Sequence, residues 1–161
     1  MESLWPDNLT GNVERAPVHL LKEQAVLLGQ QTGNFLTGKV KRIQGRDEFG
    51  FAFRVRSTVL QYEYELFKVW HGVSLYPLEI YPDSEIMEQI TGDADVVLES
   101  SEDDQIIDSD AVVADYTSRS RPKLVVHSEE AFKKALRLIF GSDKTRRIIN
   151  GIKSVADAYA D

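Results

Sequence analysis

Hydrophobic and polar positions alternate most regularly between Phe49 and Trp70. Every second residue from Phe49 to Val55 is aromatic or aliphatic, and the residues between them are glycine, alanine or arginine. The same alternation returns from Tyr62 to Leu66. A period of two is typical of half-buried strands. The pattern therefore predicts an antiparallel hairpin, with residues 57–60 as its turn.

The register of this hairpin is predicted from the chemistry of facing side chains. Pairing Arg56 with Gln61 produces one apolar face and one face of paired charges or polar groups, as cross-strand pairing favours. The other predicted pairs are Val55 with Tyr62, Arg54 with Glu63, Phe53 with Tyr64 and Phe51 with Leu66.

Helical and extended patterns flank the hairpin. Apolar residues at helical spacing behind Pro17 predict a helix over residues 17–31, which we expect to pack on the aromatic face of the sheet. Residues 35–44 read as a strand with a bulge or an early end. Residues 73–81 read as a fourth strand. Pro77 cannot donate to a ladder, so we expect this strand at the edge of the sheet.

After residue 82, the sequence pattern predicts three helices, each preceded by a residue that can cap it. Asp83 and Ser84 precede a short helix that ends at Gly92, and residues 123–127 read as a strand. Ser128 begins a further helix, and Ser142 or Asp143 begins the last one. In that last helix we expect five residues to face inward, namely Ile148, Ile149, Ile152, Val155 and Tyr159.

These patterns predict an α+β fold. An N-terminal helix packs on a four-stranded antiparallel meander, followed by an acidic segment and two C-terminal helices. The length of 161 residues suits a single domain spanning residues 1–161, with 1–14 as a loose lead-in. Residues 93–118 read as an acidic loop or irregular insertion, and short edge strands are the alternative for its apolar pairs.

Charge is unevenly distributed along this chain. The net charge is −7, from 26 acidic and 19 basic residues. Twelve of the acids lie between Asp83 and Ser118, where there is no lysine or arginine. The rest of the chain carries 14 acids against 19 bases, a net charge of +5. A mildly basic body with one acidic segment indicates recognition by charge complementarity.

Catalytic and cofactor motifs give little support to an enzyme. There is no cysteine, so thiolate metal sites and disulfides are excluded. The three histidines lack metal-ligand spacing, and no glycine-rich phosphate loop or nucleophile motif occurs. Paired aspartates in the acidic segment could bind calcium or magnesium, but the EF-hand pattern is not met. We expect no cofactor and no metal.

The leading hypothesis is a non-enzymatic, cytoplasmic protein-interaction module, such as an inhibitor, an immunity-like or antitoxin-like protein, or an adaptor. We expect a protein partner, for which the acidic segment favours a basic one, and an edge strand through which the chain could also form a homodimer. The N-terminus lacks a signal-peptide pattern, and no apolar run approaches the roughly 20 residues that span a bilayer, so we expect no membrane. The candidate partner-binding residues are Asp93, Asp95, Glu102, Asp103, Asp104, Asp108, Asp110, Trp70, His71 and Pro77.

Two alternatives remain open at this stage. The first is a nucleic-acid-binding module whose basic surface is screened by the acidic segment, with Lys144, Arg146 and Arg147 as its candidate residues. These cations oppose the dipole at the start of the last helix, which is locally unfavourable and suggests a partner. The net charge makes nucleic-acid binding by the whole chain unlikely on physical grounds. The second alternative is a small enzyme with carboxylates and His71 in a cleft.

Overall fold

The computed structural model describes residues 1–10, 14–98, 108–117 and 121–159, which form an α+β fold. A mostly antiparallel sheet carries its strands in the order β1-β2-β3-β4-β7-β6-β5, and only β5 and β6 pair in parallel. The helices are α1 (Pro17–Gln31), α2 (Ser84–Thr91), α3 (Glu129–Phe140) and α4 (Asp143–Ala158). The strands are β1 (Thr37–Ile43), β2 (Phe49–Ser57), β3 (Tyr62–His71), β4 (Leu78–Pro82), β5 (Val96–Leu98), β6 (Val112–Asp115) and β7 (Lys123–Val126).

The prediction of a four-stranded meander with β4 at its edge was wrong. The sheet has seven strands, and β4 pairs with β3 on one side and with β7 on the other. Pro77 lies just before the first residue of β4, where its missing N–H removes no bond from the ladder. A homodimer or strand addition at β4 is therefore ruled out, because both of its sides are already paired.

The hairpin of β2 and β3 was predicted correctly, but its register was wrong. Arg56 faces Glu63, two residues from the predicted Gln61. A shift of two residues keeps every side chain on its face, so the hydrophobic pattern cannot distinguish the two registers. The pairing also shifts beyond Arg54, because Phe53 faces Phe67 and Leu66 is left as an extra residue. This bulge allows Leu66 and Phe67 both to be buried.

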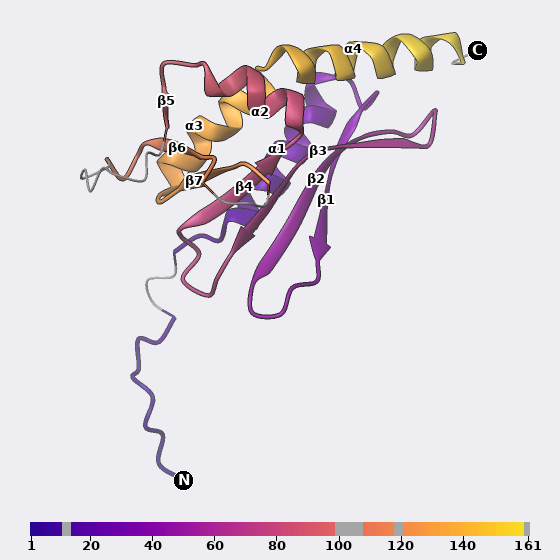
Figure 1. The fold of residues 1–161 in the computed structure, drawn as a ribbon. Helices are drawn as coiled ribbons and strands as arrows, with labels where there is room; N and C mark the ends of the chain where they lie inside the picture. The colour runs from indigo at the N-terminus through magenta and orange to yellow at the C-terminus, as the bar shows by residue number, and fades with distance from the viewer. Residues whose placement is uncertain (11–13, 99–107, 118–120, 160–161) are drawn as a thin grey trace.

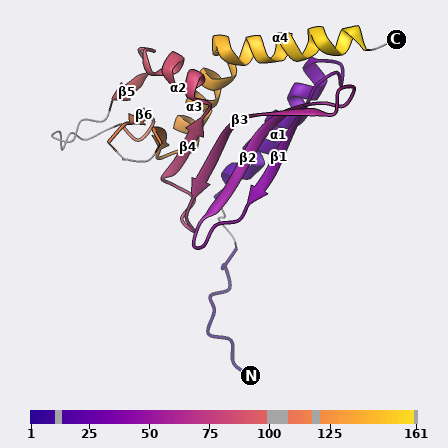
Figure 2. The same cartoon turned by 45° about the vertical axis from the view of Figure 1, so that its right-hand side comes forward.

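The helices α1 and α3 pack on the same face of the sheet and leave the other face of β1 to β3 uncovered by helices (Figures 1 and 2). A methyl group added to Gly38 would lie 2.5 Å from the Cα of Ala25, so α1 rests directly on β1. Phe53 stacks on Phe67 and also contacts Phe140 of α3, with 5.3 Å between ring centroids in each pair. This aromatic cluster joins the sheet to α3.

Helix boundaries follow the predicted caps closely. The predicted helix over 17–31 coincides with α1, which begins at Pro17 without a side-chain cap. Side chains of Asp83, Ser128 and Ser142 accept backbone N–H groups at the starts of α2, α3 and α4. These caps are short-range features, which explains why the sequence identifies them so well.

The inward-facing stripe predicted for α4 was only partly correct. Ile152 is buried, whereas Val155 is 50% and Tyr159 is 72% exposed. The first turns of α4 pack on α2 and α3, but its later turns cross the end of the sheet beyond them (Figure 1). The C-terminal part of this stripe is therefore exposed to solvent.

Residues 93–118 contain regular structure within their described part. β6 lies between β5 and β7, and all four of its residues are buried. The predicted strand over 35–44 corresponds to β1, which ends at Ile43 and pairs with β2 without a bulge. Residues 1–10 contain no helix or strand. No helix in the described chain is long and apolar enough to cross a membrane.

Candidate functional site

The longer of the two edge strands of the sheet is β1. This strand has seven residues and pairs with β2 alone, so alternate N–H and C=O groups point away from the sheet. The opposite edge strand, β5, has only three residues. An unpaired edge is a template for an added strand unless the protein blocks it. The length of β1 makes it the better candidate for binding an extended segment.

Three basic residues, Lys39, Lys41 and Arg42, lie on β1. The Lys39 ammonium donates to Glu63 at 3.1 Å, and this hydrogen bond lowers the pKa of that carboxyl. Arg54 and Arg56 also approach Glu63, each at 3.3 Å. Neither Lys41 nor Arg42 forms an ion pair with any other described residue. Two cations at the edge are therefore free to pair with a partner.

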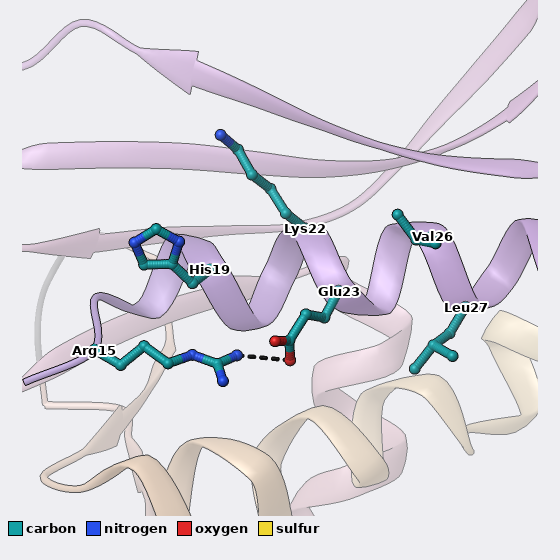
Figure 3. A pocket seen from close by; sticks show the side chains of 6 residues that line it. All are labelled: Arg15, His19, Lys22, Glu23, Val26 and Leu27. Carbon is teal, nitrogen blue, oxygen red and sulfur yellow. Dashed lines mark ion pairs between the residues drawn. The ribbon is translucent and has the colours of Figure 1, made fainter.

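The flank of α1 extends this basic surface. In Figure 3, Lys22 and Val26 point to the side of the helix where the strands lie, whereas Arg15, Glu23 and Leu27 point to the opposite side. Arg15 and Glu23 are joined at 2.6 Å, a contact that raises the pKa of the arginine. Lys22 forms no ion pair within the described chain, and Val26 is 60% exposed. A strand lying outside β1 would have this flank of α1 beside it.

A groove lies between the first half of α1 and the paired strands β1 and β2. Its volume is about 340 Å³. Lys22 stands on the helix side and Arg42 on the strand side, and aromatic rings contribute part of its apolar lining. The lining residues are Val18, Lys22, Val40, Arg42, Phe49 and Phe51. The groove thus combines two cations with an apolar surface.

His71 and Trp70 do not form a joint site. They are the last two residues of β3 and therefore point to opposite faces of the sheet. The Trp70 ring lies against Gly45 and Gly50, where an added methyl group would lie 2.7 and 2.5 Å from it. His71 is 5% exposed and packs against Phe49. These two candidate partner-binding residues therefore lie within a strand and on different faces of the sheet.

Three of the described candidate carboxylates, those of Asp93, Asp108 and Asp110, have local structural contacts. The side chains of Asp93 and Asp108 accept the backbone N–H groups of Asp95 and Asp110, two residues further on. Asp110 also accepts the Ser128 hydroxyl at 2.8 Å, beside the start of α3. These contacts order turns, a common use of aspartate. Three further candidates, Glu102, Asp103 and Asp104, lie outside the described residues.

The basic cluster at the start of α4 is partly neutralised. Lys144 lies 3.2 Å and Arg147 lies 3.7 Å from the carboxylate of Glu85. Arg147 also pairs with Asp143 at 3.0 Å, and Arg146 donates to the Gly141 carbonyl. Glu85 and Asp143 offset the unfavourable charge near the helix start. A structural reason for the cluster therefore exists without nucleic acid.

Sequence reasoning missed Lys22 and Arg42 as site residues. The sequence analysis gave no role to Lys22 on the helix over 17–31 or to Arg42 on the strand over 35–44. The available signal was the basic run from Lys39 to Arg42, which becomes informative once β1 is known to be the edge. Among the described residues, no three acidic or histidine side chains gather where they could hold a metal ion.

Three features thus lie together in the described part of the chain: the edge strand β1, cations that form no ion pair there, and an adjoining groove with apolar lining. Comparison with known proteins found no matching family model, no matching curated protein and no matching solved structure.

Proposed function

We propose that this protein is a protein-interaction module that binds an acidic, extended segment of a partner along the outer edge of β1. The observation that carries the proposal is the seven-residue edge strand whose Lys41 and Arg42 form no ion pair with the other residues that the structure describes. In strand addition, the main chain supplies affinity and alternate side chains supply specificity. The edge-strand part of the sequence hypothesis is thereby moved from β4 to β1.

Charge selects the kind of partner. A second copy of β1 would bring its own Lys39, Lys41 and Arg42 against the first three, and like charges placed opposite one another are destabilising. Lysine on an edge strand is a common protection against such self-pairing. An acidic segment removes the repulsion and gains attraction to Lys41, Arg42 and Lys22. The proposed complex is therefore heteromeric.

The flank of α1 favours a strand over a shapeless acidic tail. A strand outside β1 directs half of its side chains to the helix side of the sheet, where Lys22 and the exposed Val26 are available. The other half lies on the side of Lys39 and Lys41. Acidic side chains of the partner strand can pair with lysines on both faces of the sheet, and an apolar side chain of the partner can pack on Val26. The expected ligand alternates carboxylates with occasional aliphatic side chains.

A basic partner held by the acidic segment stays a prediction. Its described members Asp93, Asp108 and Asp110 already bind backbone or hydroxyl groups, so the carboxylates have a local purpose. Lys41 and Arg42, in contrast, form no ion pair with any other described residue. For this reason the proposal places the partner at β1.

The proposal is tested by selecting peptides of random sequence that bind the whole protein. We expect the selected peptides to be acidic and β-prone, and to shift the backbone NMR signals of β1. The variant Lys41→Glu should bind them at least about tenfold more weakly, since about 1.4 kcal/mol is lost per tenfold change. The matched control is Lys153→Glu, the same charge change at an exposed position of α4.

Equal losses in the two variants would indicate a general charge effect and overturn the assignment to β1. Selected peptides without acidic enrichment would overturn the charge argument. If single-stranded DNA of mixed sequence displaces the peptides and binds more tightly, with strong salt dependence, the nucleic-acid alternative replaces the proposal.

A further inference from the structure

We infer that the groove between α1 and the ends of β1 and β2 accepts the carboxyl-terminal residue of the partner chain. Its terminal carboxylate would lie between Lys22 and Arg42, and its apolar side chain would lie on Phe49 and Phe51. The inference rests on the proposed function and specifies which part of the partner lies at the end of the added strand.

The cationic part of the groove comes from two separate elements. Lys22 belongs to α1 and Arg42 to β1, and neither side chain pairs with an acid anywhere in the described chain. Holding two unpaired cations at one groove is unfavourable in the absence of an anion. A carboxylate can accept hydrogen bonds from both, and such charge-assisted bonds are about twice as strong as neutral ones.

The apolar part of the groove, formed by Phe49 and Phe51, packs against the His71 ring. Phe49 is 38% exposed although it is a large aromatic residue at the start of a strand. The His71 ring packs against Phe49 and Phe51, with centroid distances of 5.6 and 6.1 Å. The Nδ1 of His71 donates to the Gly72 carbonyl at 2.8 Å, which fixes the orientation of the imidazole. The two phenylalanines therefore form a firm surface for an apolar side chain.

A chain terminus fits this combination better than an internal residue does. An ordinary internal residue has either an apolar side chain or a negative charge. The last residue of a chain has both, because its α-carboxylate is ionised near neutral pH. Capture of a terminal carboxylate is a recurring mode of peptide recognition.

The location of the groove agrees with strand addition. Val40 and Arg42 contribute to the groove and also belong to the last part of β1. A partner strand that runs parallel to β1 and ends beside Arg42 would place its final residue in the groove. The same two residues thus connect the edge to the groove.

The direct probe is N-acetylphenylalanine, which presents an aromatic side chain and a carboxylate but is too short to add a strand. We expect it to shift the NMR signals of Phe49, Phe51 and His71 in the whole protein. N-acetylphenylalaninamide, which lacks the charge, should bind at least about tenfold more weakly. Lys22→Gln and Arg42→Gln should each lose this preference for the acid, while Lys153→Gln retains it.

Equal binding of acid and amide, or shifts located away from the groove, would overturn the inference. Circular dichroism and unfolding midpoints show whether the variants fold, and Phe49→Ala tests the apolar surface independently by reducing the binding of both probes. A peptide with an internal phosphotyrosine that binds more tightly than one with a free carboxyl-terminal phenylalanine would also overturn it. Binding of N-acetylphenylalanine without any binding of acidic peptides along β1 would refute the proposed function and leave the groove assignment intact.

Discussion

Replacing Phe53 by alanine is expected to destabilise the protein more than any change on the uncovered face of the sheet. The side chain is 2% exposed and contacts the rings of both Phe67 and Phe140. Phenylalanine-to-alanine changes in cores cost about 3–5 kcal/mol, and each aromatic pair adds about 0.5–1.5 kcal/mol beyond area burial. Because two pairs are lost, we expect Phe53→Ala to cost about 5 kcal/mol, the upper end of that range.

The matched control is Arg54→Ala, one residue further along β2 and on the other face. Arg54 is half-buried and pairs with Glu63 at 3.3 Å and with Glu65 at 3.5 Å. Surface pairs of this kind contribute at most about 1 kcal/mol, so the control should lose less than that amount. Urea unfolding followed by circular dichroism measures both changes. Comparable midpoint shifts at equal slope would show that the assignment of the two faces is wrong.

Two further outcomes are expected. Gly38→Ala should destabilise by about 1–3 kcal/mol, because its methyl group would lie 2.5 Å from the Cα of Ala25, whereas Gly151→Ala in open space should stabilise by about 0.5–1 kcal/mol. The hydrogen bond to Asp83, together with burial, raises the pKa of Tyr64 to about 12. Since tyrosine titrates near 10 in an unfolded chain, its contribution is complete below about pH 10 and is lost as the pH rises towards 12. Tyr64→Phe should remove that part of the alkaline loss, measured by unfolding at a series of pH values.

The parts of the fold that depend on neighbouring residues could be predicted from the sequence. The bounds of α1, the serine caps and the hairpin follow from local spacing and side-chain chemistry. The register of the hairpin could not be obtained, because the two-residue alternative leaves both faces unchanged. The inner position of β4 could not be obtained either. Its partner β7 lies more than forty residues further along the chain. The hydrophobic pattern of a short apolar run does not indicate which strand it pairs with.

The difference between local and long-range features also explains why the proposed partner-binding site lies at β1 and not in the acidic segment. Sequence reasoning weighs charge by its density along the chain, so the acidic segment was the most conspicuous feature. In the folded protein, a charge that pairs with a neighbouring side chain is less available to a partner. Glu85 pairs with Lys144 and Arg147, and Asp110 accepts a bond from Ser128, so these charges are partly used within the fold.

The proposal depends on cations that form no ion pair within the described part of the chain. Lys22 on α1 and Arg42 on β1 are twenty residues apart in the sequence, yet they border one groove. Each looks ordinary in its own element, where one exposed basic residue needs no explanation. The role that we propose for them depends on the tertiary structure, in which β1 pairs with β2 alone and α1 packs against β1. A site of this kind is created by topology, and only variants that separate Lys22, Arg42 and the β1 edge from an equal charge on α4 can test it.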